Sequence, residues 1–234
     1  MSDNVSRVRV WPGLLRVIHW AAALAVVLLL LSGWLMQSGL VLNDRLYEFL
    51  LEQLHLPAGH VLGLAIVVRF YLLFRDRGVD GYSALVPGRG AWQQGIKEGL
   101  VFYTSFARTN PPRYFAHHPV WAPVYLVWWL LLAAQLVTGL LLEFGALRGL
   151  FGLSSDALLG WHLAPFGWLA MLAVLHVVSA FLNDLKGSGS DVSAMINGHR
   201  TFETGEKTGP AKVAAPPSVS LNDLGVWKPP KDKS

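Results

Sequence analysis

Two histidines, His162 and His176, lie fourteen residues apart in an otherwise apolar stretch, residues 161–182. An α-helix rises about 1.5 Å per residue, so the two imidazoles would lie about 21 Å apart along one helix. Fourteen steps of about 100° return to within about 40° of the starting direction, so both rings would face the same side. A polar ring without a partner is costly in apolar surroundings. Each histidine is therefore expected to have a partner at its own depth.

The composition indicates a membrane protein. Of the 234 residues, 53% are hydrophobic and only 15% are charged, which is too apolar for an ordinary soluble domain. The chain has no cysteine, which excludes disulfides, thiolate-held iron–sulfur clusters and covalently attached c-type haem. Basic residues are not clustered with aromatic ones, so nucleic acid is not an expected partner. A metal or redox centre would have to rest mainly on the eight histidines.

Four apolar runs approach the length of about 20 residues that crosses a bilayer. They are residues 14–36, 57–75, 120–142 and 161–182. Basic residues gather before the first run, between the second and third, and after the fourth, whereas the other two loops hold only Arg45 and Arg148. By the positive-inside rule, both termini and the long middle loop would be cytoplasmic. The sequence therefore predicts an all-α, four-transmembrane-helix bundle with both termini cytoplasmic.

Two further segments complete the expected organisation. Apolar residues recur at helical spacing in residues 91–107, which predicts a short helix that lies on the cytoplasmic membrane face or packs on the bundle. Residues 204–234 are rich in proline, lysine and small residues and are expected to form a flexible cytoplasmic tail. The chain would thus consist of one membrane domain, residues 1–203, and this tail.

The expected orientation gives each of the first two histidines a partner. His19 lies early in the first run, which starts in the cytoplasm, and so shares the depth of His176. His60 lies early in the second run, which starts outside, and so shares the depth of His162. Two axial imidazoles can hold a b-type haem between facing helices. The pairs predict a di-haem core of two haems b, with His60/His162 at the outer haem and His19/His176 at the inner one.

One glycine fits this interpretation, and several alternatives compete with it. Gly33 stands fourteen residues after His19 and could give the outer haem clearance beside the first helix.

Interhelical hydrogen bonds or a histidine-gated transport path could also explain buried histidines, but no Asp or Glu lies well inside the four runs. A zinc site is disfavoured because ligands about 21 Å apart cannot share one ion. His55 and His199 look like ordinary polar loop residues, and His199 could also contact a partner.

Short motifs follow one another along the chain in a characteristic order. They are LRVIHW in the first run, HVLGLAIVVRFYLLF in the second, HHPV before the third, GWH and LH in the fourth, and INGHRTF after it. Over about residues 8–203 this order resembles the b-type cytochrome subunit of membrane-bound Ni/Fe hydrogenases. Formate dehydrogenase gamma subunits and bacterial cytochromes b561 are similar in plan. The resemblance implies that four histidines bind haem iron: His19, His60, His162 and His176.

The resemblance also implies a function and partners. Family members carry electrons from the iron–sulfur subunit of a periplasmic hydrogenase or dehydrogenase, with its catalytic subunit, to quinone in the bacterial inner membrane. The chain would then be the electron-transfer subunit of a quinone-reducing oxidoreductase complex. The alternative is a stand-alone cytochrome b561-like quinol oxidase that passes electrons to a soluble acceptor. The long loop between the second and third runs is more similar to the hydrogenase type.

Several polar residues near the expected inner haem are further site candidates. Four are candidates for quinone contact or proton uptake: His117, His118, Asn183 and Asp184. The family commonly has His-Asn-Pro where this sequence has His117, His118 and Pro119, so His118 replaces the usual asparagine. For the two histidines the alternative is a turn at Pro119 where the third helix begins, and for Asn183 and Asp184 it is a solvated end of the fourth helix. Arg69 is expected either to snorkel to the membrane interface or to neutralise a propionate of the inner haem.

Overall fold

The structure is a computed structural model that describes most of the expected membrane domain. The described residues are 5–40, 43–75, 78–79, 81–86, 88–105, 116–118, 121–186 and 191–203. The expected tail, 204–234, and the last two residues of the segment 91–107 lie outside them. In chain order the elements are β1 (Val5–Arg9), α1 (Gly13–Gln37), α2 (Asp44–Glu48), the π-helix η1 (Phe49–His55), α3 (Leu56–Arg75), α4 (Tyr82–Leu85), α5 (Arg89–Thr104), α6 (Trp121–Glu143), α7 (Gly145–Leu150), α8 (Ser155–Leu163), α9 (Phe166–Lys186), α10 (Asp191–Asn197) and β2 (His199–Glu203).

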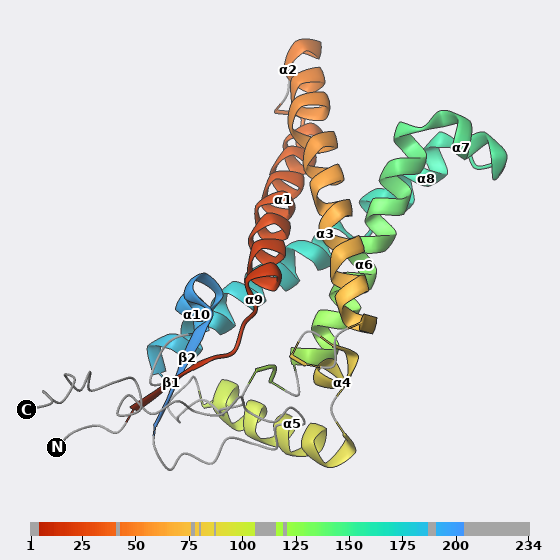
Figure 1. The fold of residues 1–234 in the computed structure, drawn as a ribbon. Helices are drawn as coiled ribbons and strands as arrows, with labels where there is room; N and C mark the ends of the chain where they lie inside the picture. Colours follow the sequence, from red (N-terminus) through yellow and green to blue (C-terminus); the bar gives the residue numbers. More distant parts are fainter. Residues whose placement is uncertain are drawn as a thin grey trace, which may run out of the picture.

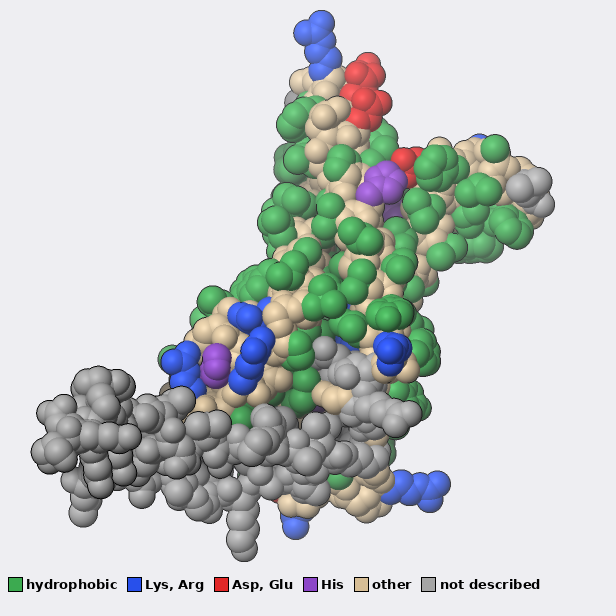
Figure 2. Space-filling model, in the orientation of Figure 1, with side chains coloured by type: hydrophobic (Ala, Val, Ile, Leu, Met, Phe, Trp, Pro, Cys, Tyr) green, Lys and Arg blue, Asp and Glu red, His purple; other side chains and the backbone are tan. Residues whose placement is uncertain are grey.

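Four helical stretches within the described residues are long and apolar enough to cross a membrane (Figure 1). They are Gly13–Gln37, Asp44–Arg75, Trp121–Glu143 and Ser155–Leu185. Hydrophobic side chains cover the middle of these helices, while charged side chains lie toward the two ends (Figure 2). The predicted all-α fold with four membrane spans is confirmed. We call the end that holds β1, β2 and α10 the sheet end, and the end that holds α2 and α7 the tip end.

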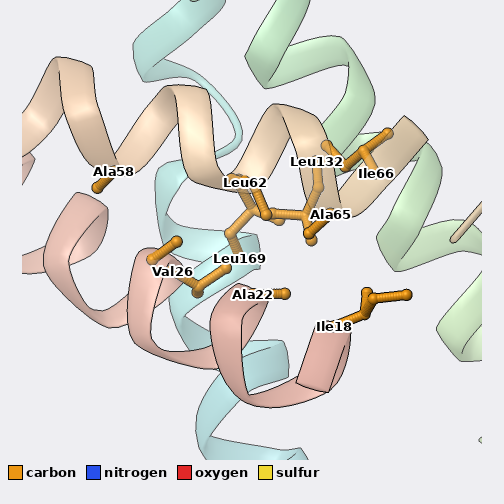
Figure 3. Packing of buried hydrophobic residues seen from close by; sticks show 10 residues of the cluster. Ile18, Ala22, Val26, Ala58, Leu62, Ala65, Ile66, Leu132 and Leu169 are labelled. Atoms are coloured by element: carbon orange, nitrogen blue, oxygen red, sulfur yellow. The ribbon is translucent and has the colours of Figure 1, made fainter. Parts of the chain in front are cut away.

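The core lies where α1, α3, α6 and α9 meet. Small residues on the facing sides of α1 and α3 allow the two backbones to approach closely, and Ala22, Ala25 and Ala65 are each at most 6% exposed. Leu62 and Leu169 point into the same space from α3 and α9 (Figure 3). Membrane helices lack a hydrophobic driving force toward one another, so this close packing is what holds them together.

The second span begins at Asp44 and not at residue 57, where the apolar run begins. Pro57 has no amide proton to donate to an α-helical bond. The turn before it widens into η1, where the Leu56 N–H donates to the Leu51 carbonyl, five residues back. The helix thereby continues through the proline, and His55 lies inside a long helix and not in a loop.

The fourth span is broken beside His162. The helix α8 ends at Leu163 and α9 begins at Phe166, with Pro165 between them. A proline cannot donate the backbone hydrogen bond that would join the two segments. His162 and His176 therefore lie in two helical segments of one span, α8 and α9, and the expectation that one uninterrupted helix carries both is corrected.

A small antiparallel sheet joins the two ends of the described chain, and nothing in the apolar pattern predicts it. Strand β1 pairs with β2 in the register Val5↔Glu203 to Arg9↔His199. The Arg16 guanidinium and the Trp20 indole donate to backbone carbonyls of α10, the latter to Met195 over 2.8 Å. The helix α5 also lies at this end (Figure 1); it begins at Arg89, two residues before the segment 91–107 that is predicted to be helical, and ends at Thr104.

Gly198 forms the turn between α10 and β2, and replacing it with alanine should destabilise the protein. Its φ of +87° lies in the left-handed region, and an added Cβ would lie 3.0 Å from the Trp11 carbonyl oxygen. The left-handed conformation alone costs about 1–2 kcal/mol in a residue with a side chain. We expect Gly198→Ala to lower the thermal unfolding midpoint, measured by circular dichroism in detergent. Gly88→Ala is the control because Gly88 has a φ of −64° and open space around it; an equal drop in both variants would contradict the prediction.

Candidate functional site

At the sheet end, the structure brings His19 of α1 and His176 of α9 together. Their ring centroids lie 6.0 Å apart with an interplanar angle of 65°. Aromatic rings of α6 surround His176, with Tyr125 at 5.5 Å and Trp128 at 5.7 Å between centroids. This is the pairing that the sequence predicts at the inner depth.

At the tip end, the partner of His162 is His55 and not His60. The ring centroids of His55 and His162 lie 6.2 Å apart at 70°. His60 Nε2 instead lies 3.3 Å from a carboxylate oxygen of Glu143, and the His60 side chain is 52% exposed. Five residues along an α-helix turn the side chain by about 140°, so His55 and His60 cannot both face α8. The predicted His60/His162 pair is therefore corrected to His55/His162.

Polar groups on neighbouring helices hold both rings of this outer pair. Ser32 Oγ of α1 lies 2.8 Å from His55 Nδ1, and Thr138 Oγ1 of α6 lies 2.9 Å from His162 Nδ1. The Gln135 amide donates to the His162 backbone carbonyl over 2.8 Å. That carbonyl lies at the break between α8 and α9, so the amide of Gln135 satisfies an acceptor in the last turn of α8.

Two glycines make room for the same rings. An added Cβ at Gly33 would lie 3.6 Å from His55 Cε1, and one at Gly139 would lie 3.3 Å from His162 Cε1. The sequence predicts that Gly33 gives clearance to the outer haem, whereas the structure places it against the imidazole of an outer histidine. Polar residues inside membrane spans are the signal that could have indicated Ser32, Gln135 and Thr138.

The two pairs fit haem iron. A metal–imidazole bond is about 2 Å long and the nitrogen lies about 1 Å from the ring centre, so two trans axial imidazoles have ring centres about 6 Å apart. Both observed separations match this value. No group of three or more His, Cys, Asp or Glu side chains in the described ranges could hold a metal ion. Each pair thus offers two ligands only, and a porphyrin would supply the others.

Arg69 is buried at the sheet end and does not snorkel. It is 6% exposed on α3, and its positive charge acts on His117. The His117 Nε2–H donates to the Val79 carbonyl over 3.2 Å. Burial above all, and then the charge of Arg69, lower the pKa of His117 to about 4. Burial likewise lowers the pKa of His118 to about 4, although Glu98 acts in the opposite direction.

His117 lies one aromatic ring away from the inner pair. Its ring centroid is 5.1 Å from that of Trp11 and 6.3 Å from that of Tyr125, which in turn contacts His176. Sequence reasoning did not identify Tyr125, because one tyrosine in an apolar span resembles ordinary packing. The structure therefore places His117 in a continuous series of rings that begins at an inner histidine.

Asp184 has a structural role that the sequence did not indicate. Its carboxylate accepts hydrogen bonds from the backbone N–H groups of Asp191 and Val192, the latter over 3.0 Å, at the start of α10. A carboxylate at a helix N-terminus satisfies backbone donors that have no partner within the helix. Asn183 lies beside it in the last turn of α9, partly exposed.

Known proteins with similar sequences share one description. A family model described as prokaryotic cytochrome b561 matches residues 10–198. The chain is 24% identical over 225 residues to the "Probable Ni/Fe-hydrogenase 1 B-type cytochrome subunit" of Escherichia coli K12, which covers 88% of this chain and 95% of that protein. The corresponding proteins of Rhodobacter capsulatus (221 residues, 84% and 82% covered) and Azotobacter vinelandii (216 residues, 84% and 89% covered) are each 27% identical. No solved structure matches the chain significantly.

The low pKa of His117 predicts a stability that decreases in acid. The unfolded chain takes up the proton near pH 6.5, whereas the buried imidazole resists it to about pH 4. The unfolded state therefore binds more protons in this window, and the folded state loses stability as the pH falls through it. We expect His117→Gln, which keeps an N–H donor for Val79, to reduce the fall in unfolding midpoint between pH 7 and pH 5. The same fall in both proteins would contradict this.

Proposed function

Because the chain belongs to the prokaryotic cytochrome b561 family, we propose that it is a membrane-anchoring di-haem subunit that carries electrons to quinone. The relatives are named as cytochrome subunits of Ni/Fe hydrogenases, and we assign this chain the same kind of partner. The iron–sulfur centre that delivers the electrons would belong to another subunit, since this chain has no cysteine. The catalytic subunit would lie beyond it on the periplasmic side.

One observation carries the proposal: two imidazole pairs lie at opposite ends of the bundle, each with the ring separation that one iron requires. His55 and His162 would hold the outer haem, and His19 and His176 the inner haem. When bound, each haem b supplies a centre that accepts and releases one electron. The protein's own contribution is to fix the four rings and to exclude water between the helices.

The distribution of charge supports the direction of transfer. Basic residues are frequent in the sequence segments that form the sheet end, so this end would face the cytoplasm. An electron that moves from the outer to the inner pair then travels toward the negative side, at a cost of about 2.3 kcal/mol per 100 mV. If quinone takes its protons from the cytoplasm, the subunit helps to build the membrane potential.

The quinone would bind near His117 and His118. His117 continues the ring series from His176 through Tyr125. The Nε2–H of His117 donates to the Val79 carbonyl and the low pKa of His117 keeps the ring neutral, so Nδ1 can accept a hydrogen bond from the hydroxyl group of the quinol that forms when the quinone is reduced. We do not assign Asp184 to the quinone site, because its carboxylate accepts hydrogen bonds from the backbone at the start of α10.

Haem content tests the proposal and separates His55 from His60. We expect two haems b per purified chain, measured by reduced-minus-oxidised spectra and the pyridine assay. His55→Ala should lose the outer haem and His176→Ala the inner one, because each removes an axial ligand. His60→Ala is the matched control and should keep both haems, since His60 pairs with Glu143. A chain without haem, expressed with sufficient haem supply, would overturn the proposal; haem loss in His60→Ala alone would restore the His60/His162 pairing.

Haem reoxidation tests the quinone site. In the haem-loaded, reduced protein, we expect His117→Leu to slow reoxidation by a water-soluble quinone analogue about fivefold to tenfold, the effect of one lost hydrogen bond. Asp184→Asn should leave this rate unchanged while it lowers the unfolding midpoint. The site would be misplaced if His117→Leu reoxidised at the wild-type rate with both haems present.

A further inference from the structure

Each outer histidine is held by a hydroxyl residue and the glycine that follows it. On α1 these are Ser32 and Gly33, which meet His55; on α6 they are Thr138 and Gly139, which meet His162. In both cases the hydroxyl oxygen meets Nδ1 and the glycine lies against the ring carbon Cε1. The same local arrangement thus occurs twice, on two different helices.

The backbone fixes the direction of the hydrogen bond at His55. Ser32 Oγ lies 2.6 Å from the Leu28 carbonyl oxygen, and a carbonyl can only accept. A serine hydroxyl has one proton, so that proton is used at Leu28. The oxygen of Ser32 must therefore accept its second hydrogen bond from His55 Nδ1–H, 2.8 Å away.

The same reasoning applies to His162. Thr138 Oγ1 lies 3.1 Å from the Ala134 carbonyl and 3.0 Å from the Gln135 carbonyl, so its proton points to the backbone. Its oxygen accepts from His162 Nδ1–H over 2.9 Å. A neutral imidazole with its proton on Nδ1 has its lone pair on Nε2. Both outer histidines are thus held in the tautomer that binds a metal through Nε2.

His176 of the inner pair differs in this respect. His176 Nδ1 is buried and has no hydrogen-bond partner in the described part of the chain. A serine does lie nearby, but Ser179 Oγ donates to the His176 backbone carbonyl over 2.9 Å and not to the ring. The neighbours of this ring are the aromatic side chains of Tyr125 and Trp128.

We propose that Ser32 and Thr138 are positioning residues that lower the reduction potential of the outer haem relative to the inner one; this rests on the proposed function. An acceptor on Nδ1–H makes a ligating imidazole more basic. A more basic axial ligand stabilises ferric over ferrous iron, and axial ligation and hydrogen bonding are recognised determinants of haem potential. Electrons then pass spontaneously from the outer to the inner haem, which offsets part of the work against the membrane potential.

Spectroelectrochemical titration of the purified, haem-loaded protein tests this. Ser32→Ala and Thr138→Val should each raise the outer midpoint potential, so that the reduced-to-oxidised ratio of the outer haem at a fixed potential rises up to about fivefold, the equilibrium effect of one ordinary hydrogen bond. The inner haem should not change. His176→Ala and His55→Ala, which would each retain one haem, assign the two waves.

The controls separate the hydroxyl from packing. Ser32→Thr and Thr138→Ser keep a hydroxyl and should keep the wild-type potential, and Ser179→Ala should change neither haem. If Ser32→Ala loses the outer haem altogether, retention of that haem in Ser32→Thr supports the proposal. Unchanged potentials in Ser32→Ala and Thr138→Val with both haems present, or an equal shift in Thr138→Ser, would overturn it. If the potentials contradict the proposal but the wild-type protein binds two haems, the proposed function still stands. A wild-type protein that binds no haem would overturn the positioning role and the proposed function together.

Discussion

Two imidazoles that bound one haem iron from opposite sides would have their ring centres about 6 Å apart, because the metal–nitrogen bond length and the size of the ring set this separation. The structure has this separation twice, in the His19/His176 pair and in the His55/His162 pair, and contacts throughout the bundle maintain it. At the sheet end, α1 and α9 must approach each other, and the Arg16 and Trp20 contacts to α10 hold the end of α9 close to α1. At the tip end, η1 and α8 must approach each other, and α1 and α6 support them from either side.

The sequence predicts the four spans and the inner pair because hydropathy and depth suffice for both. His19 and His176 lie well inside apolar runs, so a small error in helix boundaries does not alter their depth. The outer pair could not be predicted in this way. Polar residues such as Glu52 interrupt the apolar pattern in the first turns of the second span, so hydropathy predicts a helix that begins after His55. The first histidine inside that predicted helix is His60, which is therefore predicted as the partner of His162. The phase of a helix also changes at a π-helical turn, which η1 introduces before Pro57.

The periodicity of apolar residues also cannot predict contacts between distant parts of the chain. Strands β1 and β2 lie at opposite ends of the described sequence, and five residues of each are too few to give a pattern. The Asp184 carboxylate looks like a solvated helix end until α10 is placed against it. In the spans, by contrast, polar side chains are informative by themselves: Ser32, Gln135 and Thr138 all contact a histidine of the outer pair.

The same ligand type experiences different electrostatics at the two ends of the molecule. Hydroxyl oxygens face the outer imidazoles, and an oxygen acceptor favours the more positive, oxidised state of a metal that the ring would bind. At the sheet end, the charges of Arg69 and Arg200 both act on His117, and the aromatic series links His117 to His176. Buried positive charge favours an added electron nearby, since Coulomb interactions are weakly screened in a low dielectric. Both effects have the same sign, and together they would favour an electron at the inner end, beside the quinone site that we propose at His117.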